Sequence, residues 1–463
     1  MTIETAIAAL REMLGDRLST TTAILQQHGE NEAYHPVTPP DAVAFPLNTA
    51  EVSDIVKICA AHGCPVVAYG TGTSLEGHQL AVHGGISLDM SRMNAVLEVH
   101  AEDMDVVVQP GVTREQLNAD LRATGLFFPV DPGANASLGG MAATRASGTT
   151  AVRYGTMKEN VLALEVVLAD GRIIRTGSRA RKSSAGYDLT KLMVGSEGTL
   201  GIITELTLKL HGQPEAVSAA MCAFPDVESA VNTVITTIQS GIPMARMELV
   251  DANMARGFNL ANGTDLPETP HLFVEFHGSP AGVAEQAENF GAIAKDFGAA
   301  GFKWAEKPED RTALWRMRHN AYHAHKALAP NLPGLSTDAC VPISRLAEAI
   351  AFAGEEIVKL GLVYTIVGHV GDGNFHCLVS FDPADAAQYA KVKAFIDTLA
   401  RKAIALNGTA TGEHGVGIGK MAYMEEEHGA ALDVMRAIKQ ALDPQGLLNP
   451  GKMLPPGNGS RPA

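Results

Sequence analysis

The chain lacks the features of a disulfide-stabilised, membrane-spanning or nucleic-acid-binding protein. Its five cysteines, an odd number at irregular spacing, do not form the pattern of a disulfide framework. No uncharged apolar run approaches the roughly 18 residues that a membrane helix needs. No basic run offsets the net charge of −15, which repels phosphate backbones. We therefore expect reduced thiols, a cytoplasmic location and no nucleic-acid partner.

The N-terminus shows no basic region followed by an apolar core, so we also expect no signal peptide. Peripheral attachment to a membrane stays open. Aromatic residues are scarce at 5%, whereas glycine is abundant at 46 of 463 residues. That length predicts two or three domains. The glycine excess indicates many tight turns and close backbone approaches, as in loops that surround a phosphate-bearing cofactor.

The pattern of apolar residues changes near residue 213. The first 30 residues have helical spacing, and short strands and helices then alternate up to residue 210. Beyond 213, helices of ten or more residues alternate with isolated strands, which predicts an antiparallel sheet with helices on one face. Residues 442–454 hold too many turn residues for a helix, and we expect the last nine residues to be disordered.

Three loops rich in Gly, Thr and Ser precede the change at 213: residues 69–77, 131–140 (continuing to 155) and 195–201. Consecutive backbone N–H groups in such loops form concave anion sites. The nicotinamide fingerprint G-x-G-x-x-G does not fit the first loop, because four residues separate Gly72 from Gly77. Alone, that loop is as compatible with a plain turn as with a phosphate site. Three loops together favour a long ligand wrapped by backbone, such as a dinucleotide.

The segment His369-Val-Gly-Asp-Gly-Asn-Phe-His376 predicts a hairpin. With Asp372-Gly373 as a two-residue turn, His369 and His376 stand directly opposite one another on one face. Their Cβ atoms would then be roughly 5 Å apart, close enough to bind one divalent metal ion. The alternative is a pair of histidines that are only hydrogen-bonded within a sheet. Gly412-Glu413-His414-Gly415 could add a carboxylate ligand.

Together with Asn449-Pro-Gly-Lys452, these motifs make the chain resemble flavoproteins of the vanillyl-alcohol-oxidase or p-cresol-methylhydroxylase (PCMH) type. It is most similar to the group of FAD-dependent D-lactate dehydrogenases, glycolate oxidase catalytic subunits and D-2-hydroxyglutarate dehydrogenases, over about residues 36–454. The resemblance implies an α+β fold. Its expected parts are an N-terminal helical segment (1–35), a PCMH-type FAD-binding domain (36–212), a substrate or cap domain with the hairpin (213–412), and a C-terminal segment that completes the active site (413–463).

The resemblance implies that the glycine loops bind FAD. The positions carried over are Gly70, Thr71, Gly72, Thr73, Ser74, Gly77, His78, Pro132, Gly133, Ser137, Gly139, Gly140, Ala146, Ser147, Gly148, Tyr154, Glu197, Gly198, Gly201, Ile202, Ile203 and Asn449. Some related flavoproteins attach FAD through a histidine in the first loop, near His78. This group usually binds FAD without a covalent bond, so we expect non-covalent FAD.

The resemblance also implies that His369, His376 and Glu413 hold one divalent ion and that His414 is the catalytic base. Zn²⁺ suits these ligands best, and Mn²⁺ or Fe²⁺ is also compatible. His414 would take the hydroxyl proton of a 2-hydroxy acid while C2 gives a hydride to flavin N5. Adjacent strand residues point to opposite faces, so Glu413 and His414 need an irregular backbone, which the flanking glycines permit.

A substrate carboxylate needs a fixed cation, and the resemblance favours Arg318, with Tyr322 one helical turn later on the same face. The alternative for Arg318 is an exposed basic turn of a helix. Ser336-Thr337-Asp338 stands where hydroxyglutarate enzymes carry a lysine, which favours a D-lactate-like substrate. The expected partners are a 2-hydroxy acid and an electron acceptor, either a quinone, a cytochrome or an electron-transfer flavoprotein.

Three alternatives and one question of assembly stay open. The chain could be a glycolate oxidase subunit or a D-2-hydroxyglutarate dehydrogenase. It could also be a flavin-binding electron-transfer subunit, although the presence of all four metal and base residues argues against that. A metallohydrolase without flavin would leave the three glycine loops unexplained. A homodimer also stays open.

Overall fold

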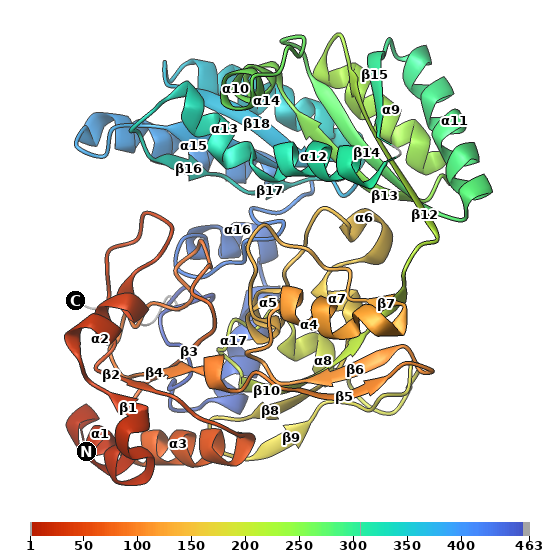
Figure 1. Ribbon diagram of the computed structural model, residues 1–463. Coiled ribbons are helices and arrows are strands. Elements are labelled where there is room, and N and C mark those ends of the chain that lie inside the picture. The colour runs from red at the N-terminus through yellow and green to blue at the C-terminus, as the bar shows by residue number, and fades with distance from the viewer. Residues whose placement is uncertain (1, 306, 457–463) are drawn as a thin grey trace. The chain divides into compact units, whose positions relative to one another are not determined.

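A computed structural model describes residues 2–305 and 307–456 (Figure 1). The chain forms two compact units. Unit 1 holds the described residues up to Ser147, residues Gly155–Gln213, and those from Glu413 onward. Unit 2 holds Gly148–Tyr154 and Pro214–Gly412. Of the tail expected to be disordered, residues 457–463 lie outside the described residues.

The first sheet of unit 1 has the order β1-β2-β4-β3, in which β4 pairs in parallel with β2 and β3. Helices α1 and α3 pack on this sheet through buried side chains such as Leu10, Ile55 and Val56. Asn48 caps the start of α3, and Gly63 ends it in the left-handed conformation that glycine favours. The elements are α1 (Ile3–Leu14), β1 (Leu18–Ser19), α2 (Thr22–Gly29), β2 (Ala42–Ala44), α3 (Thr49–His62), β3 (Val66–Tyr69) and β4 (Ile86–Asp89).

The second sheet of unit 1 is antiparallel, with the order β5-β6-β10-β8-β9. Its core joins buried strand residues such as Val106 and Leu206 to Leu117 of α4 and Met141 of α5. A short pair, β7 with β11, lies apart from it. The elements are β5 (Val96–His100), β6 (Asp105–Val108), α4 (Arg114–Asp120), β7 (Leu126–Phe127), α5 (Leu138–Thr144), α7 (Met157–Asn160), β8 (Val161–Val167), β9 (Ile173–Arg175), α8 (Leu189–Met193), β10 (Ile202–Lys209) and β11 (His211–Gly212).

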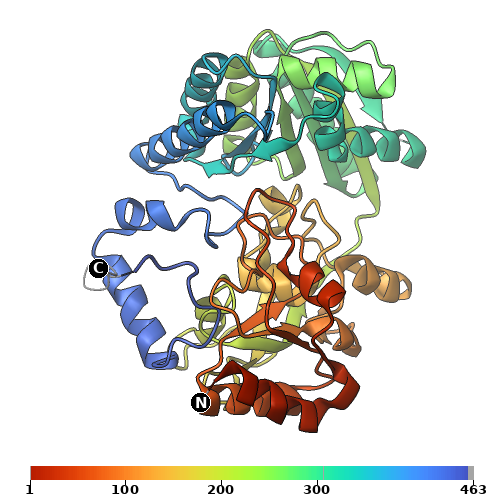
Figure 2. The ribbon, with the colours of Figure 1, turned by 90° about the vertical axis from the view of Figure 1, so that its left-hand side faces the viewer.

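The C-terminal segment returns to unit 1 and packs beside its N-terminal part (Figure 2). It contains α16 (Met424–His428) and α17 (Ala431–Leu442). The backbone of Val66 in β3 bonds to both Leu447 and Asn449, with N–O distances of 2.9 and 2.8 Å. Residues 443–454 form no helix, as the turn residues predict, whereas Leu442, the first residue of that expected loop, ends α17.

Unit 2 is built on an eight-stranded antiparallel sheet. Seven strands follow the order β15-β12-β14-β13-β18-β19-β16, and the eighth, β17, pairs with β19. The expected α+β class is confirmed, but helices cover both faces of this sheet, where helices on one face were expected. The strands are β12 (Ala216–Ala223), β13 (Met244–Val250), β14 (His271–Gly278), β15 (Ala300–Ala305), β16 (Gly334–Ser336), β17 (Ala339–Cys340), β18 (Tyr364–His369) and β19 (Asn374–Ser380).

The two faces of this sheet differ in chemistry. One is apolar, with Val274 and Phe375 fully buried, and it is covered by helices such as α11, whose Phe290 stacks edge-on against Phe276. The other carries Glu248 among polar residues, and α10, α12 and α13 cover its apolar part. The helices of unit 2 are α6 (Ala151–Tyr154), α9 (Val227–Gln239), α10 (Ala252–Asn262), α11 (Pro280–Asp296), α12 (Pro308–His319), α13 (Ala321–Leu328), α14 (Leu346–Val358) and α15 (Ala386–Ala405).

Residues Gly148–Tyr154 were expected within the FAD-binding domain but belong to unit 2. Tyr154 Oη lies 2.7 Å from Nδ1 of His277 in β14, and Arg153 donates to the backbone oxygen of Pro243. Val152 packs where Gly371 has no side chain, since a Cβ there would lie 2.6 Å from Val152. These contacts, which are distant in sequence, attach the segment to the sheet of unit 2.

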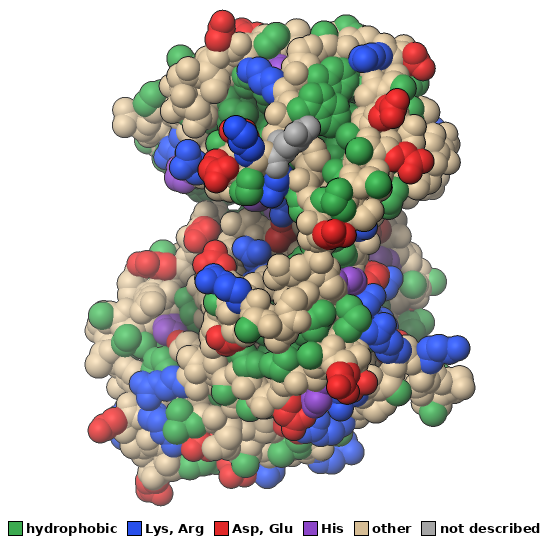
Figure 3. Space-filling model, turned by 45° about the vertical axis from the view of Figure 1, so that its right-hand side comes forward, with side chains coloured by type: hydrophobic (Ala, Val, Ile, Leu, Met, Phe, Trp, Pro, Cys, Tyr) green, Lys and Arg blue, Asp and Glu red, His purple; other side chains and the backbone are tan. Residues whose placement is uncertain are grey.

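Acidic and basic side chains are interspersed on the face of each unit drawn in Figure 3. All five cysteines are free, as expected. Among the described residues, no helix combines the length and the apolar character required to cross a membrane.

Candidate active site

The structure brings the three glycine-rich loops of unit 1 together. A Cβ on Gly70 of the first loop would lie 2.4 Å from Ser137 Oγ of the second. The third loop bonds to α5, because the N–H of Gly195 donates to the oxygen of Ala142 at 2.9 Å. Asn449 joins the first and third loops, since its amide donates to the oxygens of His78 and Glu197 at 3.1 and 2.7 Å. The close approach of these glycine-rich backbones fits a ligand held by several loops.

The predicted FAD residues differ in what surrounds them. Gly139 packs against Pro110, where a Cβ would lie 2.5 Å from Pro110 Cβ, and Gly201 packs against Val166 in the same way. Ile202 and Ile203 are buried in β10. These four residues therefore have packing reasons of their own. Gly133, by contrast, has no atom within 4 Å of a Cβ position, and Gly198 has only Ala68 at 3.8 Å, so both leave room for a ligand.

His78, which lies near the position where some related flavoproteins attach FAD, has both ring nitrogens close to protein groups. Nδ1 forms a short hydrogen bond with Ser74 Oγ, and Nε2 lies 3.2 Å from Glu197 Oε1. Burial alone would raise the pKa of Glu197. The adjacent His78 side chain and the N–H groups of Val416 and Gly417 outweigh burial and lower that pKa. The Glu197 carboxylate is turned toward these protein groups, which the sequence did not indicate.

The hairpin of unit 2 forms, but the predicted register is wrong. His369 pairs with Asn374 and Val367 pairs with His376, so the loop is residues 370–373. The N–H of Asp372 donates to the oxygen of His369 at 3.0 Å, and Gly373 has a φ of +79°. A shift of two residues keeps every side chain on its original face. The two histidines therefore stand diagonally on one face, with ring centroids 5.5 Å apart.

Each of these histidines has its Nδ1 held by an acceptor. His369 Nδ1 lies 2.7 Å from Glu248 Oε1, and His376 Nδ1 lies 2.8 Å from the backbone oxygen of Thr337. Because a carboxylate and a carbonyl oxygen can only accept, both Nδ1 atoms carry the hydrogen. Each neutral ring then has its lone pair on Nε2. Fixing the tautomer through Nδ1 is how proteins orient histidine ligands of metal ions.

Glu413 follows Gly412, the last residue of unit 2, by one peptide bond. Gly412 packs directly on the hairpin, since a Cβ there would lie 2.2 Å from Asn374 Nδ2. One ligand atom each from His369, His376 and Glu413 lie within 4.8 Å of one another. Two imidazoles and a carboxylate at this spacing fit a divalent ion with open positions for a substrate.

His414 lies in an irregular stretch, as the flanking glycines predict, with φ of +81° at Gly415 and +47° at Gly417. Its side chain is mostly buried, at 12% exposed. Nδ1 is 3.9 Å from Glu76 Oε1, and Nε2 is 3.7 Å from Glu413 Oε1. Two carboxylates near one imidazole favour its protonated form once it has taken a proton.

Glu248 was missed in the sequence, although it is fully buried beside the candidate metal ligands. It is the direct cross-strand neighbour of His369. One carboxylate oxygen accepts from His369, and the other accepts from Arg318 Nη2 at 2.6 Å. The alternation of Arg246 and Glu248 with Met247 and Leu249 is the available signal, because it predicts a strand with one polar face.

Arg318 is buried, not an exposed basic turn, and its Nε has no hydrogen-bond partner among the described residues. Tyr322 does not lie one turn further along the same helix, so that expectation is wrong. Helix α12 ends at His319, and Tyr322 belongs to α13, where it is 43% exposed. Asn320 separates the two helices. Asparagine favours such ends because its side chain competes for backbone hydrogen bonds.

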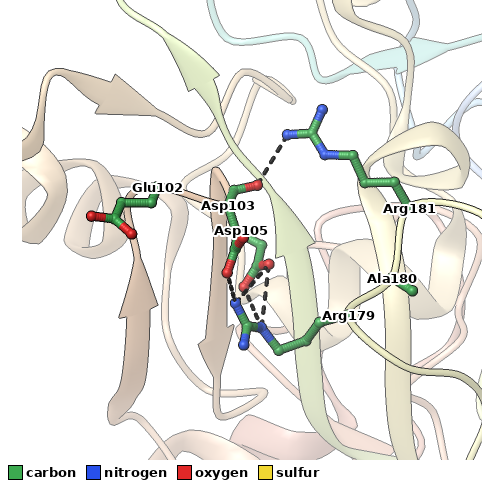
Figure 4. A pocket seen from close by; sticks show the side chains of 6 residues that line it. All are labelled: Glu102, Asp103, Asp105, Arg179, Ala180 and Arg181. Atoms are coloured by element: carbon green, nitrogen blue, oxygen red, sulfur yellow. Dashed lines mark hydrogen bonds and ion pairs between the residues drawn. The ribbon is translucent and has the colours of Figure 1, made fainter.

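A surface pocket of about 450 Å³ in unit 1 contains none of the predicted site residues. It is lined by Glu102, Asp103, Asp105, Arg179, Ala180 and Arg181. Arg179 pairs with both Asp103 and Asp105, and Arg181 donates to the backbone oxygen of Asp103 (Figure 4). Because Arg179 and the two aspartates are paired with each other, we assign no function to this pocket.

Comparison with known proteins shows the family of the chain. Residues 40–177 match an FAD binding domain, and residues 213–453 match the C-terminal domain of FAD linked oxidases. A probable mitochondrial D-lactate dehydrogenase of Danio rerio is 50% identical over 98% of this chain and 92% of its own length. A mitochondrial D-lactate dehydrogenase [cytochrome] of Arabidopsis thaliana is 47% identical over 97% and 80%.

Among solved structures, p-cresol methylhydroxylase with substrate bound superposes with a TM-score of 0.77 at 16% identity. The match covers 97% of this chain and 96% of that one. It confirms the PCMH-type fold. The expected cytoplasmic location is contradicted, because the similar D-lactate dehydrogenases above are named as mitochondrial. Reduced cysteines and net charge do not distinguish one reducing compartment from another, which explains the error.

The two family models match residues in both units of the chain. The family match extends over more than half of its residues. The chain is therefore an enzyme of the FAD-linked oxidases and carries the FAD-binding domain of that family.

Proposed function

We propose that this enzyme oxidises D-lactate, or a closely similar D-2-hydroxy acid, to the 2-oxo acid. The observation that carries the proposal is the orientation of His369 and His376. Both rings are fixed through Nδ1, and one ligand atom each of His369, His376 and Glu413 lie within 4.8 Å of one another. A site with three protein ligands leaves open positions at which a hydroxy acid can bind.

In this proposal His369, His376 and Glu413 hold a divalent metal, with Zn²⁺ the best match and Mn²⁺ or Fe²⁺ compatible. The metal would lower the pKa of the substrate hydroxyl, and FAD, bound without a covalent link by the loops of unit 1, would accept the hydride from C2. His414 would take the hydroxyl proton, and Glu76 and Glu413 would stabilise the imidazolium that results.

Arg318 would bind the substrate carboxylate. Its guanidinium has five N–H donors, and Glu248 already fixes one end of the group at 2.6 Å. The buried Nε has no partner among the described residues and so still has a hydrogen to donate. An arginine that is held by a buried carboxylate loses little side-chain entropy when a second carboxylate binds.

The substrate class follows from the names of the relatives and from one sequence feature. The two relatives above are named as D-lactate dehydrogenases. Thr337 and Asp338, in the segment where hydroxyglutarate enzymes carry a lysine, are used to hold the hairpin. Thr337 accepts from His376, and Asp338 accepts from Asn374 Nδ2 at 2.8 Å. Without a lysine in that segment, the cation expected to bind a second substrate carboxylate is missing there, which favours lactate over hydroxyglutarate.

The test is anaerobic reduction of the bound flavin. Purified holoenzyme is mixed with a panel of D- and L-2-hydroxy acids, and the loss of visible flavin absorbance is followed. We expect D-lactate to bleach the flavin fastest and the L-isomer to leave it oxidised. If D-2-hydroxyglutarate or glycolate reduces the flavin faster, that acid is the substrate and D-lactate is not. If no acid reduces the flavin, the proposal is refuted.

A further inference from the structure

Glu197 lies in the third glycine loop, yet its side chain reaches the segment that carries Glu413 and His414. Its two carboxylate oxygens accept from the N–H groups of Val416 and Gly417 at 2.7 and 2.9 Å. The residue is 5% exposed.

The backbone at Glu197 shows that its side chain is not required by the turn. Glu197 has a φ of +55°, in the left-handed region that disfavours residues with a Cβ. Its neighbours Gly195 and Gly198 also have positive φ. A glycine at 197 would therefore adopt this conformation with less strain, and the carboxylate must contribute something beyond the turn.

His78 extends the link from Glu197 to the first loop. Its Nε2 lies 3.2 Å from Glu197 Oε1, while its Nδ1 bonds to Ser74 Oγ. Gly415 packs against both residues, because a Cβ there would lie 2.7 Å from His78 Nε2 and 2.8 Å from Glu197 Oε1. The chain Ser74–His78–Glu197 thus runs from the first glycine loop to the residues that follow His414.

Further contacts join the same two segments. The N–H of Ile418 donates to the backbone oxygen of Glu76 at 2.8 Å, and Gly417 packs so closely there that a Cβ would lie 2.1 Å from that oxygen. Asn449 bonds to the backbone oxygens of both His78 and Glu197. The first loop and residues 415–418 therefore lie side by side over several residues.

We propose that Glu197 and His78 are positioning residues. They fix segment 413–417, and with it Glu413 and His414, to the loop that carries Ser74. The inference deepens the proposed function and rests on it, since His414 acts as the base only in that proposal. It also gives His78 and Glu197 a role other than direct contact with FAD. The lowered pKa of Glu197 keeps its carboxylate charged, so that its bonds to the two N–H groups are charge-assisted.

The first test is hydrogen exchange of the FAD-loaded protein, which needs no substrate. Glu197→Gln keeps the side-chain size and removes the charge. We expect the amides of residues 413–417 to exchange about tenfold faster than in the wild type. Unchanged exchange would overturn the inference. Glu51→Gln is the matched control, because Glu51 pairs with Arg17 and accepts from Leu47 elsewhere in unit 1, and it should leave exchange at 413–417 unaltered.

The second test separates flavin binding from flavin reduction. In Glu197→Gln we expect the rate constant of anaerobic reduction at saturating D-lactate to fall by about tenfold or more, while the Kd of FAD changes by less than about threefold. A purely structural role would instead lower thermal stability and leave the rate of the FAD-loaded fraction unchanged, as we expect for Glu51→Gln.

Gly415→Ala covers the case in which Glu197→Gln does not fold. Its Cβ would displace His78 and Glu197 from each other, so it should also accelerate exchange at 413–417. Exchange identical to the wild type in that variant would overturn the inference. If D-lactate does not reduce the wild-type flavin, the proposed function fails. The exchange experiments still decide whether Glu197 holds the segment.

Discussion

Replacing Glu248 by Gln should weaken metal binding although Glu248 is not a ligand. Its carboxylate is fully buried between His369 and Arg318, at 2.7 and 2.6 Å. Glutamine could still accept from His369, but it would place an amide against one of the two donors and leave the Arg318 charge without its counterion. Loss of a partner that orients a metal-binding histidine typically costs about 10–100-fold in metal affinity. Breaking a buried ion pair costs about 3–5 kcal/mol in stability.

The assay is equilibrium competition for the metal against a chelator, with thermal unfolding measured on the same samples. Glu275→Gln is the matched control. Glu275 lies on the same face of the sheet, is 5% exposed, and bonds to His277 at 2.8 Å, but it contacts no candidate ligand. We expect both variants to lose stability and only Glu248→Gln to lose metal affinity. Equal metal affinity in the two variants would refute the role assigned to Glu248.

Three further predictions concern the metal, the base and pH. Treatment with a chelator should abolish turnover while the visible spectrum of bound FAD stays; full activity without metal would contradict the proposed site. His414→Ala should keep FAD and metal but reduce its flavin with D-lactate about 10²–10⁴-fold more slowly, and a fast variant would remove His414 as the base. Burial raises the pKa of Asp251 to about 7, against the opposing hydrogen bond from the N–H of Met254. The folded state therefore holds this proton more tightly than the unfolded state, whose pKa is about 4. The contribution of Asp251 to stability is thus present below about pH 4 and lost as pH rises to about 7. Asp251→Asn should remove that loss, which unfolding measured at pH 5 and pH 8 would show.

The sequence predicted which residues share a site better than it predicted their geometry. The prediction that both histidines lie on one face of the hairpin is correct despite the wrong register. Side chains alternate along a strand, so an error of two residues leaves both histidines on the same face. The register itself depends on the loop, and the four residues 370–373 hold two glycines that permit more than one turn. Gly373 packs with its Cβ position 2.1 Å from the backbone oxygen of Val341, a contact that no local pattern indicates.

Helix continuity was harder to predict. Tyr322 was expected one helical turn after Arg318, yet α12 ends at His319 and the backbone turns at Asn320, so the two residues lie on different helices. The domain assignment of Gly148–Tyr154 was wrong for a different reason. Its place in unit 2 depends on contacts with His277, Pro243 and Gly371, which follow it by about a hundred residues or more. Local periodicity carries no information about such contacts.

Glu248 was missed because it lies on a central strand of the sheet, where both faces are covered by other residues. Strand β13 lies between β14 and β18, so hydrophobicity alone marks it as core. The feature that distinguishes β13 from an ordinary core strand is Glu248, a charged residue whose side chain is not exposed to solvent. A buried charge is stable only if it is paired, and here the cross-strand neighbour His369 and Arg318 of α12 supply the pairing. Because Glu248 fixes His369 and Arg318 at once, the orientation of a candidate metal ligand and that of the candidate carboxylate-binding residue are set by one side chain. A variant that repositions either one should therefore change both metal affinity and the KM for D-lactate.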